Sequence, residues 1–369
     1  MYYARGRGGT EAFFCPSVSV CELSIMANMK QIAKLAGVSL GTVSHVLNGT
    51  ARVREPLRKR VLEVVQASGY QPSQLARGLR RDKTNMIAMI IPDIMNPFFP
   101  SVVRGAEDLA FANGYRMILC NTDNDHAKEI VQLQSLRSYF PAGLIVISSN
   151  FSDLTAQAKS YRENGAAVVC IDRLPPNWDG DTVTIDNVDG ARKATRFLIE
   201  QGHKAIAMIA GPQLLTNAQD RLEGYRRAMQ EAGLLILPGL VQEASFDHAG
   251  GYTKTKMLLR LLPRPTAIFA SNDMIAMGAL RAIREAGLRC PEDISLIGFD
   301  GLDLTEMITP QLTSVYQSPY QLGATAARIV LDRVVDRESS PRHVVLGTEL
   351  RIRESVARPP ACAANRPSR

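Results

Sequence analysis

The sequence predicts an α/β protein in which a small all-α domain precedes two doubly wound α/β subdomains. Three observations support this fold class. The 369 residues are too many for one ordinary domain and enough for two or three. Positive charge is concentrated in the first 83 residues. From Met86 onward, short apolar runs alternate with amphipathic stretches, which is typical of parallel sheets covered by helices on both faces.

Residues 1–28 are expected to be disordered or to precede the true start of translation. Pro16 and Glu22 interrupt any apolar core of a secretory signal, and no small-residue cleavage site follows. Because well-patterned sequence begins near Met26 and Met29, we expect translation to start at one of them.

The wider composition indicates a cytoplasmic protein without a membrane partner. No apolar run reaches the roughly 18–20 residues of a membrane span. The six cysteines form no C-x-x-C pair and the five histidines show no metal-ligand spacing, so we expect neither a metal site nor a cofactor. Buried free thiols at Cys120 and Cys170 would fit a reducing compartment.

The basic charge of the chain belongs to one segment. The whole chain carries a formal charge of +7, and eleven Lys and Arg residues face only three acidic residues between Met29 and Lys83. The rest of the chain is therefore close to neutral. A small domain with such a surplus has the electrostatic footprint of a polyanion binder, whereas a merely solvated basic face would usually leave charge spread along the chain.

Residues 30–48 have the pattern of two short helices joined by a tight turn. Gly37 permits the turn, and Ser39 is a good N-cap for the second helix. Apolar residues at i, i+3 and i+4 from Val43 form one buried stripe on that helix and leave small polar groups on its other sides. This pattern predicts a helix-turn-helix whose second helix enters the DNA major groove by its N-terminal half. A third helix is expected over residues 55–68.

Several longer motifs identify a resemblance to a known family. They read A-G-V-S-x-x-T-V-S-H-V-L-N-G, R-V-R-E-P-x-R-x-R-V, G-Y-Q-P-S-Q-L-A-R-G-L-R and I-x-x-I-I-P-D-I-M-N-P-F-F. Over about residues 29–355 the chain resembles the LacI/GalR family of transcriptional repressors, both its purine-responsive and its ribose-type sugar-responsive members. The resemblance implies an all-α helix-turn-helix headpiece, a periplasmic-binding-protein-like core of two doubly wound α/β subdomains, and a homodimer that binds a pseudo-palindromic operator in double-stranded DNA.

The resemblance also implies which residues contact DNA. On the second helix, three positions would face base edges and three would contact phosphates or the backbone. In the hinge, a short helix would form only when two copies pair over DNA, because some nine residues cannot hold a helix alone in water. One hinge leucine would wedge between base pairs in the minor groove, while the other would pack against its twin. The expected DNA-binding residues are Leu40, Gly41, Thr42, Ser44, His45 and Asn48 on the helix and Leu75, Leu79 and Arg80 in the hinge.

Polar residues follow many of the strand-like runs of the core, at the strand ends where ligands of parallel sheets bind. Those singled out are Asp93, Asn121, Asp123, Asp172, Arg173, Asp186, Asn272, Asp273 and Asp300. We expect a polar small-molecule site in a cleft between the two subdomains, with aromatic faces against a ring and charged groups paired with hydroxyls. The effector contacts that the resemblance implies are Phe98, Phe99, Asp172, Arg173, Arg221, Phe246, Asn272 and Asp300.

The ligand class rests on one departure from the purine-responsive pattern. Leu215 occupies a position where the purine repressor type carries an arginine for the base. The expected effector is therefore a sugar or sugar derivative, with a purine or nucleoside as the alternative. An α/β enzyme is less expected, because G-x-S-x-G, the P-loop and a helix-opening G-x-G-x-x-G are missing. A periplasmic-type sugar-binding protein would need a cleavable signal in place of the helix-turn-helix.

The expected domain boundaries follow from these patterns. The headpiece spans 29–71, the hinge 72–83 and the effector core 84–358, after which residues 359–369 form a disordered tail. Within the core, one lobe is expected to comprise 84–185 plus 318–343 and the other 186–317 plus 344–358. Without a leucine heptad after the core, the sequence supports a dimer rather than a zipper-made tetramer.

Overall fold

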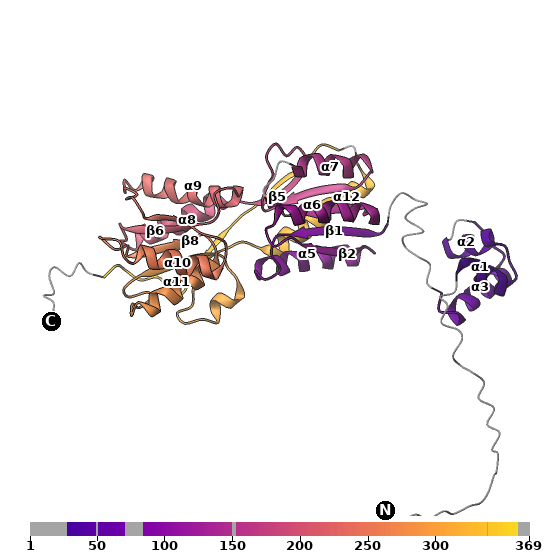
Figure 1. Cartoon of the computed structure of the whole chain (residues 1–369), viewed down its shortest axis with the longest axis horizontal. Coiled ribbons are helices and arrows are strands. Elements are labelled where there is room, and N and C mark those ends of the chain that lie inside the picture. Colours follow the sequence, from indigo (N-terminus) through magenta and orange to yellow (C-terminus); the bar gives the residue numbers. More distant parts are fainter. Residues whose placement is uncertain (1–27, 49–50, 71–83, 150–152, 338, 361–369) are drawn as a thin grey trace, which may run out of the picture. The chain divides into compact units, whose positions relative to one another are not determined.

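The computed structural model describes residues 28–48, 51–70, 84–149, 153–337 and 339–360 (Figure 1). The chain divides into two compact units, Met1–Arg77 and Gly78–Arg369, and each is considered by itself. The expected N-terminal extension up to residue 27, the hinge with Leu75, Leu79 and Arg80, and residues 361–369 of the tail lie outside the described residues. Among the described helices, none is long and apolar enough to cross a membrane.

The first unit contains the predicted helix-turn-helix. Its helices are α1 (Met29–Ala36), α2 (Leu40–Asn48) and α3 (Glu55–Ala67). Gly37 adopts a φ of 62° and ends α1, and Ser39 Oγ accepts a hydrogen bond from the Thr42 backbone N–H at 3.1 Å, as expected of an N-cap. Ile32, Val43 and Val61, one from each helix, are completely buried, so the three helices share one small core.

The second unit is the predicted pair of α/β lobes, each built on a six-stranded sheet. The first sheet has the order β11-β5-β4-β3-β1-β2 and the second the order β12-β10-β9-β8-β6-β7. The first lobe contains β1 (Met86–Ile91), α5 (Phe98–Ala112), β2 (Arg116–Asn121), α6 (His126–Leu136), η1 (Arg137–Tyr139), β3 (Gly143–Val146), α7 (Asp153–Glu163), β4 (Ala167–Ile171), β5 (Asp181–Ile185), α12 (Pro319–Val335) and β11 (His343–Leu346).

The second lobe is built in the same way from the segment between β5 and α12 together with the last strand. It contains α8 (Asn187–Glu200), β6 (Ile206–Ala210), α9 (Thr216–Glu231), β7 (Val241–Glu243), α10 (His248–Leu258), β8 (Ala267–Ala270), α11 (Asp273–Glu285), β9 (Ser295–Asp300), η2 (Asp303–Glu306), β10 (Thr313–Tyr316) and β12 (Glu349–Arg351). Among the strands that the structure describes, all pairings are parallel except that between β10 and β12.

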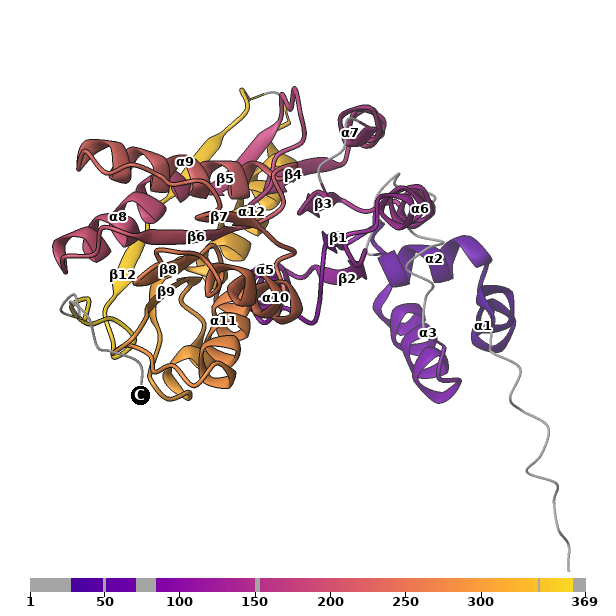
Figure 2. The ribbon, with the colours of Figure 1, turned by 60° about the vertical axis from the view of Figure 1, so that its left-hand side comes forward.

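Each sheet is covered by helices on both faces, which explains the continuous apolar strands. In β1, Ile87 and Met89 pack against α5 and α12, while Ala88 and Ile90 pack against α6 and α7. In the second lobe, α8 and α9 cover one face and α10 and α11 the other (Figure 2). Parallel strands buried on both faces need apolar side chains in both directions, as the sequence pattern indicated.

The chain passes between the lobes three times, from β5 to α8, from β10 to α12 and from β11 to β12. The third crossing differs from the predicted boundary between residues 343 and 344. Residues 344–346 belong to β11, which pairs with β5 in the first sheet. The sequence did not reveal this because β11 is short and partly exposed, so its apolar pattern is weak.

Candidate functional site

The eight effector-contact residues expected in the core gather in a single pocket between the lobes. Its volume is only about 10 Å³, so the two lobes are closed on one another. The walls come from the loop before α5 and the first turn of α5, the ends of β4 and β9, helix α9, and the loops that carry Phe246, Asn272 and Gln317. The lining residues are Asn96, Phe98, Phe99, Asp172, Arg173, Asn217, Arg221, Phe246, Asn272, Asp300 and Gln317.

Direct contacts between the lobes hold this cleft closed. Asn217 Nδ2, at the start of α9, donates to Asp172 Oδ2 of the first lobe at 3.1 Å. The neighbouring Thr216 Oγ1 accepts from the Leu174 backbone N–H at 3.2 Å. The first turn of α9 therefore contacts the segment that follows β4, so a ligand bound there would touch both lobes.

The acidic residues of the cleft sit in unusual backbone conformations. Asp172, which follows β4, has a φ of 61°, and Asp300, the last residue of β9, has a φ of 109°. A positive φ is uncommon for residues other than glycine and often marks a functional position. Asn272, in contrast, caps α11, because its Oδ1 accepts from the Ile275 N–H at 2.8 Å and its Nδ2 faces the Phe246 carbonyl at 3.3 Å.

Arg221 is the buried cation of the second lobe. Its Nε donates to Asn187 Oδ1 at 2.8 Å, and its Nη1 donates to the Ser271 carbonyl at 2.6 Å. The same Nη1 lies 3.6 Å from Asp300 Oδ1, and the guanidinium group stacks 3.8 Å from the centre of the Phe299 ring. Arg221 is thus fixed in place with its charge directed at Asp300.

Arg173 is the corresponding cation of the first lobe. Its Nη1 donates to Asn124 Oδ1 at 2.8 Å, and its Nε lies 3.6 Å from Asp172 Oδ2. Its guanidinium group lies near two aromatic rings, 5.6 Å from the centre of Phe99 and 5.7 Å from that of Phe246. The cleft therefore contains two arginines and two aspartates, and its formal charge is balanced.

Polar atoms without a hydrogen-bond partner concentrate around this cleft. Among the described residues, four buried side-chain atoms of lining residues lack such a partner, and so does one atom of Ser271, which directly precedes the lining residue Asn272. Since native proteins pair nearly all buried polar groups, a cluster of unpaired donors and acceptors indicates a polar ligand. The five atoms are Asp172 Oδ1, Arg173 Nε, Asn217 Oδ1, Ser271 Oγ and Gln317 Oε1.

The buried carboxylates of the second lobe have raised pKa values. Burial raises the pKa of Asp300 to about 7, while Arg221 opposes the shift. Burial and the nearby Asp300 raise the pKa of Asp273, whose Oδ1 and Oδ2 accept hydrogen bonds from Ser314 Oγ and the Leu302 N–H at 2.6 and 2.8 Å. A ligand that donates hydrogen bonds to Asp300 would favour its ionised form.

This raised pKa predicts a pH-dependent stability of the ligand-free protein. The native state keeps the Asp300 proton over a range in which the unfolded chain, with an aspartate pKa of about 3.9, has lost it. Because the native state then binds more protons, the free energy of unfolding should fall as the pH rises from about 4 to about 7. Thermal melts of wild type and Asp300→Asn across this range should show a smaller fall in the variant. Parallel curves would contradict the prediction.

Three lining residues were not anticipated. Asn96 lies within a quoted motif, and Gln317 directly follows β10, so the strand-end argument could have found it. Asn217 lies four residues before Arg221 on the same helix face, a spacing that also carried a usable signal. Of the other polar strand-end residues, Asp186 caps α8 and Asp123 pairs with Lys128 at an exposed position, so neither lines the cleft.

In the headpiece, the expected base-reading positions lie on the side of α2 away from its core. Val43 is buried, whereas Leu40, Gly41 and His45 are exposed and Thr42 and Ser44 are half-buried. Asn48 is the last residue of α2.

An open pocket of about 660 Å³ lies beside His45 and is lined by three arginines that the sequence did not single out for DNA contact, Arg52, Arg54 and Arg58. Arg58 forms a long ion pair with Glu55 at 3.8 Å.

Comparisons with known proteins match both the helix-turn-helix headpiece and the core to known families. The family described as "Bacterial regulatory proteins, lacI family" matches residues 28–73, and the "Periplasmic binding protein-like domain" matches residues 195–356. The chain is 37% identical over 335 residues to the "HTH-type transcriptional repressor PurR" of Pasteurella multocida, covering 90% of this chain and 99% of the relative. The chain belongs to the LacI family. This LacI-family protein is also 37% identical to the "Ribose operon repressor" of Halalkalibacterium halodurans, over 90% of this chain and 97% of that one.

Solved structures give the same result for this LacI-family protein. A "transcriptional regulator CelR-cellobiose complex" is 31% identical with a TM-score of 0.69, covering 89% of this chain and 99% of that one. A LacI-family regulator from Enterococcus faecium with bound ribose is 32% identical with a TM-score of 0.67, covering 74% and 99%. The lac repressor dimer, 23% identical with a TM-score of 0.78 over 90% and 99%, shares the fold.

Proposed function

We propose that the protein is a cytoplasmic transcriptional repressor that binds a pseudo-palindromic operator as a homodimer and whose DNA affinity is controlled by a small uncharged sugar in the cleft. The curated relatives are transcriptional repressors, which supports a binding role without catalysis. Two copies of one headpiece read two half-sites related by the same two-fold symmetry, which is why a dimer is expected.

The clustered unpaired polar atoms around the closed cleft carry the sugar assignment. They include donors and acceptors, which match the hydroxyl groups of a sugar, since each hydroxyl both donates and accepts. The two arginines and two aspartates of the cleft balance when Asp300 is ionised, which is the form that hydrogen bonds from ligand hydroxyls favour. A charged ligand would then leave one charge buried without a counterion. Phe98, Phe99 and Phe246 supply the apolar surface that such pockets present to a ring.

The size of the ligand follows from the closed cleft. A disaccharide would need the lobes to part much further than a monosaccharide would, given a free volume of about 10 Å³. The ribose complex and the ribose operon repressor among the relatives favour a pentose within this class. A purine is the second candidate because of the PurR relatives. Leu215, at the position where the purine-responsive pattern has an arginine, is 7% exposed and does not line the pocket, so this position supplies no contact for a purine base.

A thermal-shift titration of the full-length protein tests the ligand class. The panel is ribose and other pentoses, hexoses, cellobiose, and the purine bases guanine and hypoxanthine. A ligand that binds only the native state increases the free energy of unfolding by mass action, by about 2.7 kcal/mol at a ligand concentration of 100 times Kd, and so raises the Tm. We expect the largest increase with a pentose. A shift with purine bases alone would overturn the sugar assignment in favour of the second candidate.

Leu79→Ala tests the expected hinge wedge. Losing a buried leucine side chain from the minor groove should weaken operator binding by about 2 kcal/mol, which is roughly 30-fold. Binding to non-operator DNA should change little, because that binding is mainly electrostatic. Leu235→Ala, at a position 82% exposed in the second lobe, is the matched control. Equal losses on both DNAs, measured by fluorescence anisotropy, would refute the wedge.

His45→Ala tests the reading helix independently of the hinge. A base contact contributes about 1–3 kcal/mol of discrimination between bases. At the position that His45 contacts in each half-site, the variant should therefore accept base pairs that the wild type rejects. Selection of binding sites from a randomised operator library measures this directly. An unchanged preference at all positions would show that His45 reads no base.

A further inference from the structure

One amide side chain connects the buried arginine of the cleft to the first crossing between the lobes. Asn187 is the first residue of α8 and follows the crossing from β5. Its Oδ1 accepts from Arg221 Nε at 2.8 Å, and its Nδ2 donates to the carbonyl of Ile185, the last residue of β5, at 3.2 Å. The same side chain therefore contacts the first sheet and the arginine of the second lobe.

The chemistry of the two partners fixes the orientation of this amide. The guanidinium group of Arg221 can only donate and the Ile185 carbonyl can only accept, so Oδ1 has to face the arginine and Nδ2 the carbonyl. Asn187 is 2% exposed and is not among the residues that line the cleft. It therefore acts on the site through Arg221 and not by touching a ligand.

The crossing itself is a single residue, Asp186. It has a φ of −73° and a ψ of 77°, a turn conformation that is common at the ends of strands. Its backbone N–H donates at 2.9 Å to the carbonyl of Leu346, the last residue before the third crossing. A rotation of one lobe against the other has to change the torsion angles at Asp186, and with them the distance from Asn187 Nδ2 to the Ile185 carbonyl.

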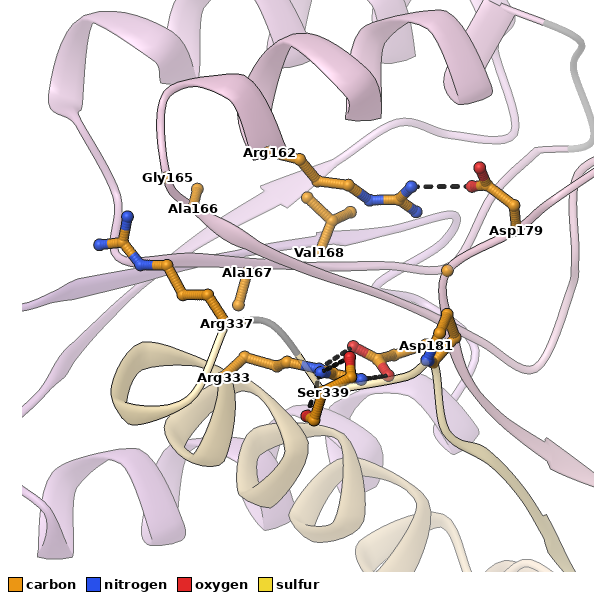
Figure 3. Close-up of a pocket in the computed structure, with 12 residues that line it drawn as sticks. Arg162, Gly165, Ala166, Ala167, Val168, Asp179, Asp181, Arg333, Arg337 and Ser339 are labelled. Atoms are coloured by element: carbon orange, nitrogen blue, oxygen red, sulfur yellow. Dashed lines mark hydrogen bonds and ion pairs between the residues drawn. The ribbon is translucent and has the colours of Figure 1, made fainter.

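The first-lobe side of this crossing is firmly held. Arg333, near the end of α12, donates from Nε and Nη2 to the two carboxylate oxygens of Asp181, the first residue of β5, at 2.8 and 2.7 Å (Figure 3). A two-point pair of this kind restrains geometry as well as adding energy, so β5 and α12 are expected to move as one body. Helix α12 follows the second crossing, so the supports of both crossings are joined.

The second crossing makes a similar contact with the other member of the ion pair in the cleft. Gln317, which directly follows β10, donates from Nε2 to Asp300 Oδ1 at 2.6 Å. Gln317 lines the cleft, so a change there would also remove contacts with a ligand. Asn187 lies outside the lining and allows the effect of the crossing to be measured by itself.

We propose that Asn187 is a positioning residue that couples the arrangement of the lobes to sugar binding by holding Arg221. With its bond to Ile185 formed, the amide is fixed and offers Arg221 an acceptor that keeps its charge directed at Asp300. When the lobes rotate and this bond breaks, the amide can turn and Arg221 loses its fixed partner. The inference rests on the proposed function, because it concerns a repressor whose DNA affinity responds to a sugar.

The test compares full-length wild type with Asn187→Leu and Asn187→Asp, using ribose as the probe. Calorimetry gives the ribose Kd, and fluorescence anisotropy gives the Kd for an operator duplex selected from a randomised library, with and without saturating ribose. The ratio of the two operator Kd values measures the coupling, and in wild type these values should differ by about fivefold or more.

The two variants should separate the two bonds of the amide. Asn187→Leu removes both, so the ribose Kd should rise about tenfold or more and the ratio should lie close to one. Asn187→Asp keeps an oxygen for Arg221 but has no donor for Ile185. Its ribose Kd should rise less than that of Asn187→Leu, while its ratio should fall equally close to one.

Thr195→Val is the matched control for the loss of a buried hydrogen bond. Thr195 is completely buried on the same helix, and its Oγ1 donates to the Ala191 carbonyl at 2.9 Å within that helix. A purely structural loss of this kind should lower the Tm and keep the ratio at the wild-type value. A wild-type ratio in both Asn187 variants would overturn the proposal.

Ligand-free melts distinguish failure of this inference from failure of the proposed function. Asn187→Leu should lower the Tm less in an Arg221→Met background than in wild type, because one of the bonds that it removes is already lost there. Equal decreases in the two backgrounds would show that Asn187 does not hold Arg221. If wild type binds no ribose, or binds it without a change in operator Kd, the proposed function fails, and the melts still decide the role of Asn187.

Discussion

In an Asp300→Ala variant, sugar affinity is expected to fall about 100-fold or more while operator binding stays at the wild-type level. Asp300 is 4% exposed, accepts a hydrogen bond from Gln317 Nε2 at 2.6 Å and faces Arg221. Hydrogen bonds from ligand hydroxyls to a charged group contribute about 1.5–3 kcal/mol each, so two of them account for the expected loss. The headpiece belongs to the other compact unit, which is why DNA binding should survive.

The measurement pairs a sugar titration with an operator-binding assay on the same protein. Asp303→Ala is the matched control, because Asp303 is exposed and lies three residues further along the chain. Wild-type sugar affinity in Asp300→Ala would show that the carboxylate does not contact the ligand. Loss of operator binding together with the sugar response would point instead to a damaged fold.

Arg221→Met is expected to lower the free energy of unfolding by about 3–5 kcal/mol and to abolish sugar binding. Removing one partner from a buried ion pair leaves the other charge uncompensated, which is the costly case for such pairs. Arg221 also supplies the hydrogen bonds that Asn187 and the Ser271 carbonyl accept, and both acceptors would lose them. The resulting decrease in Tm should be several degrees for a core of this size.

Arg227→Met provides the control on the same helix. Arg227 is exposed and pairs with Glu223 at 2.6 Å, and exposed pairs of this kind contribute at most about 1 kcal/mol. Melting curves of the two variants, with and without sugar, separate the roles. A Tm of Arg221→Met equal to that of Arg227→Met would contradict the structural role, and a sugar-induced increase in its Tm would contradict the binding role.

The sequence predicted the fold well where a local pattern determines it. The turn at Gly37, the cap at Ser39 and the buried stripe from Val43 are local features, and all three are present in the headpiece. The doubly wound lobes were equally predictable, because strands buried on both faces leave continuous apolar runs. The lobe boundary was less predictable, since β11 contributes only four partly exposed residues to the first sheet.

The candidate site was predicted unevenly for a different reason. Asp172, Arg221 and Asp300 were expected as contacts, and the structure places them in one pocket. The helical spacing of Asn217 to Arg221 could have placed it at the cleft, but its contact with Asp172 depends on closure of the lobes, which brings Nδ2 within 3.1 Å of Oδ2. No local pattern in the sequence encodes that contact between residues 45 positions apart.

The three crossings between the lobes constrain how this regulator can diversify. Each lobe is assembled from separate stretches of the gene, so no single recombination event can exchange one lobe for that of another regulator. The DNA-reading unit, in contrast, is one uninterrupted segment and can be transferred with a single junction. Operator preference can therefore change by shuffling, whereas a new effector preference has to accumulate through individual substitutions around the cleft.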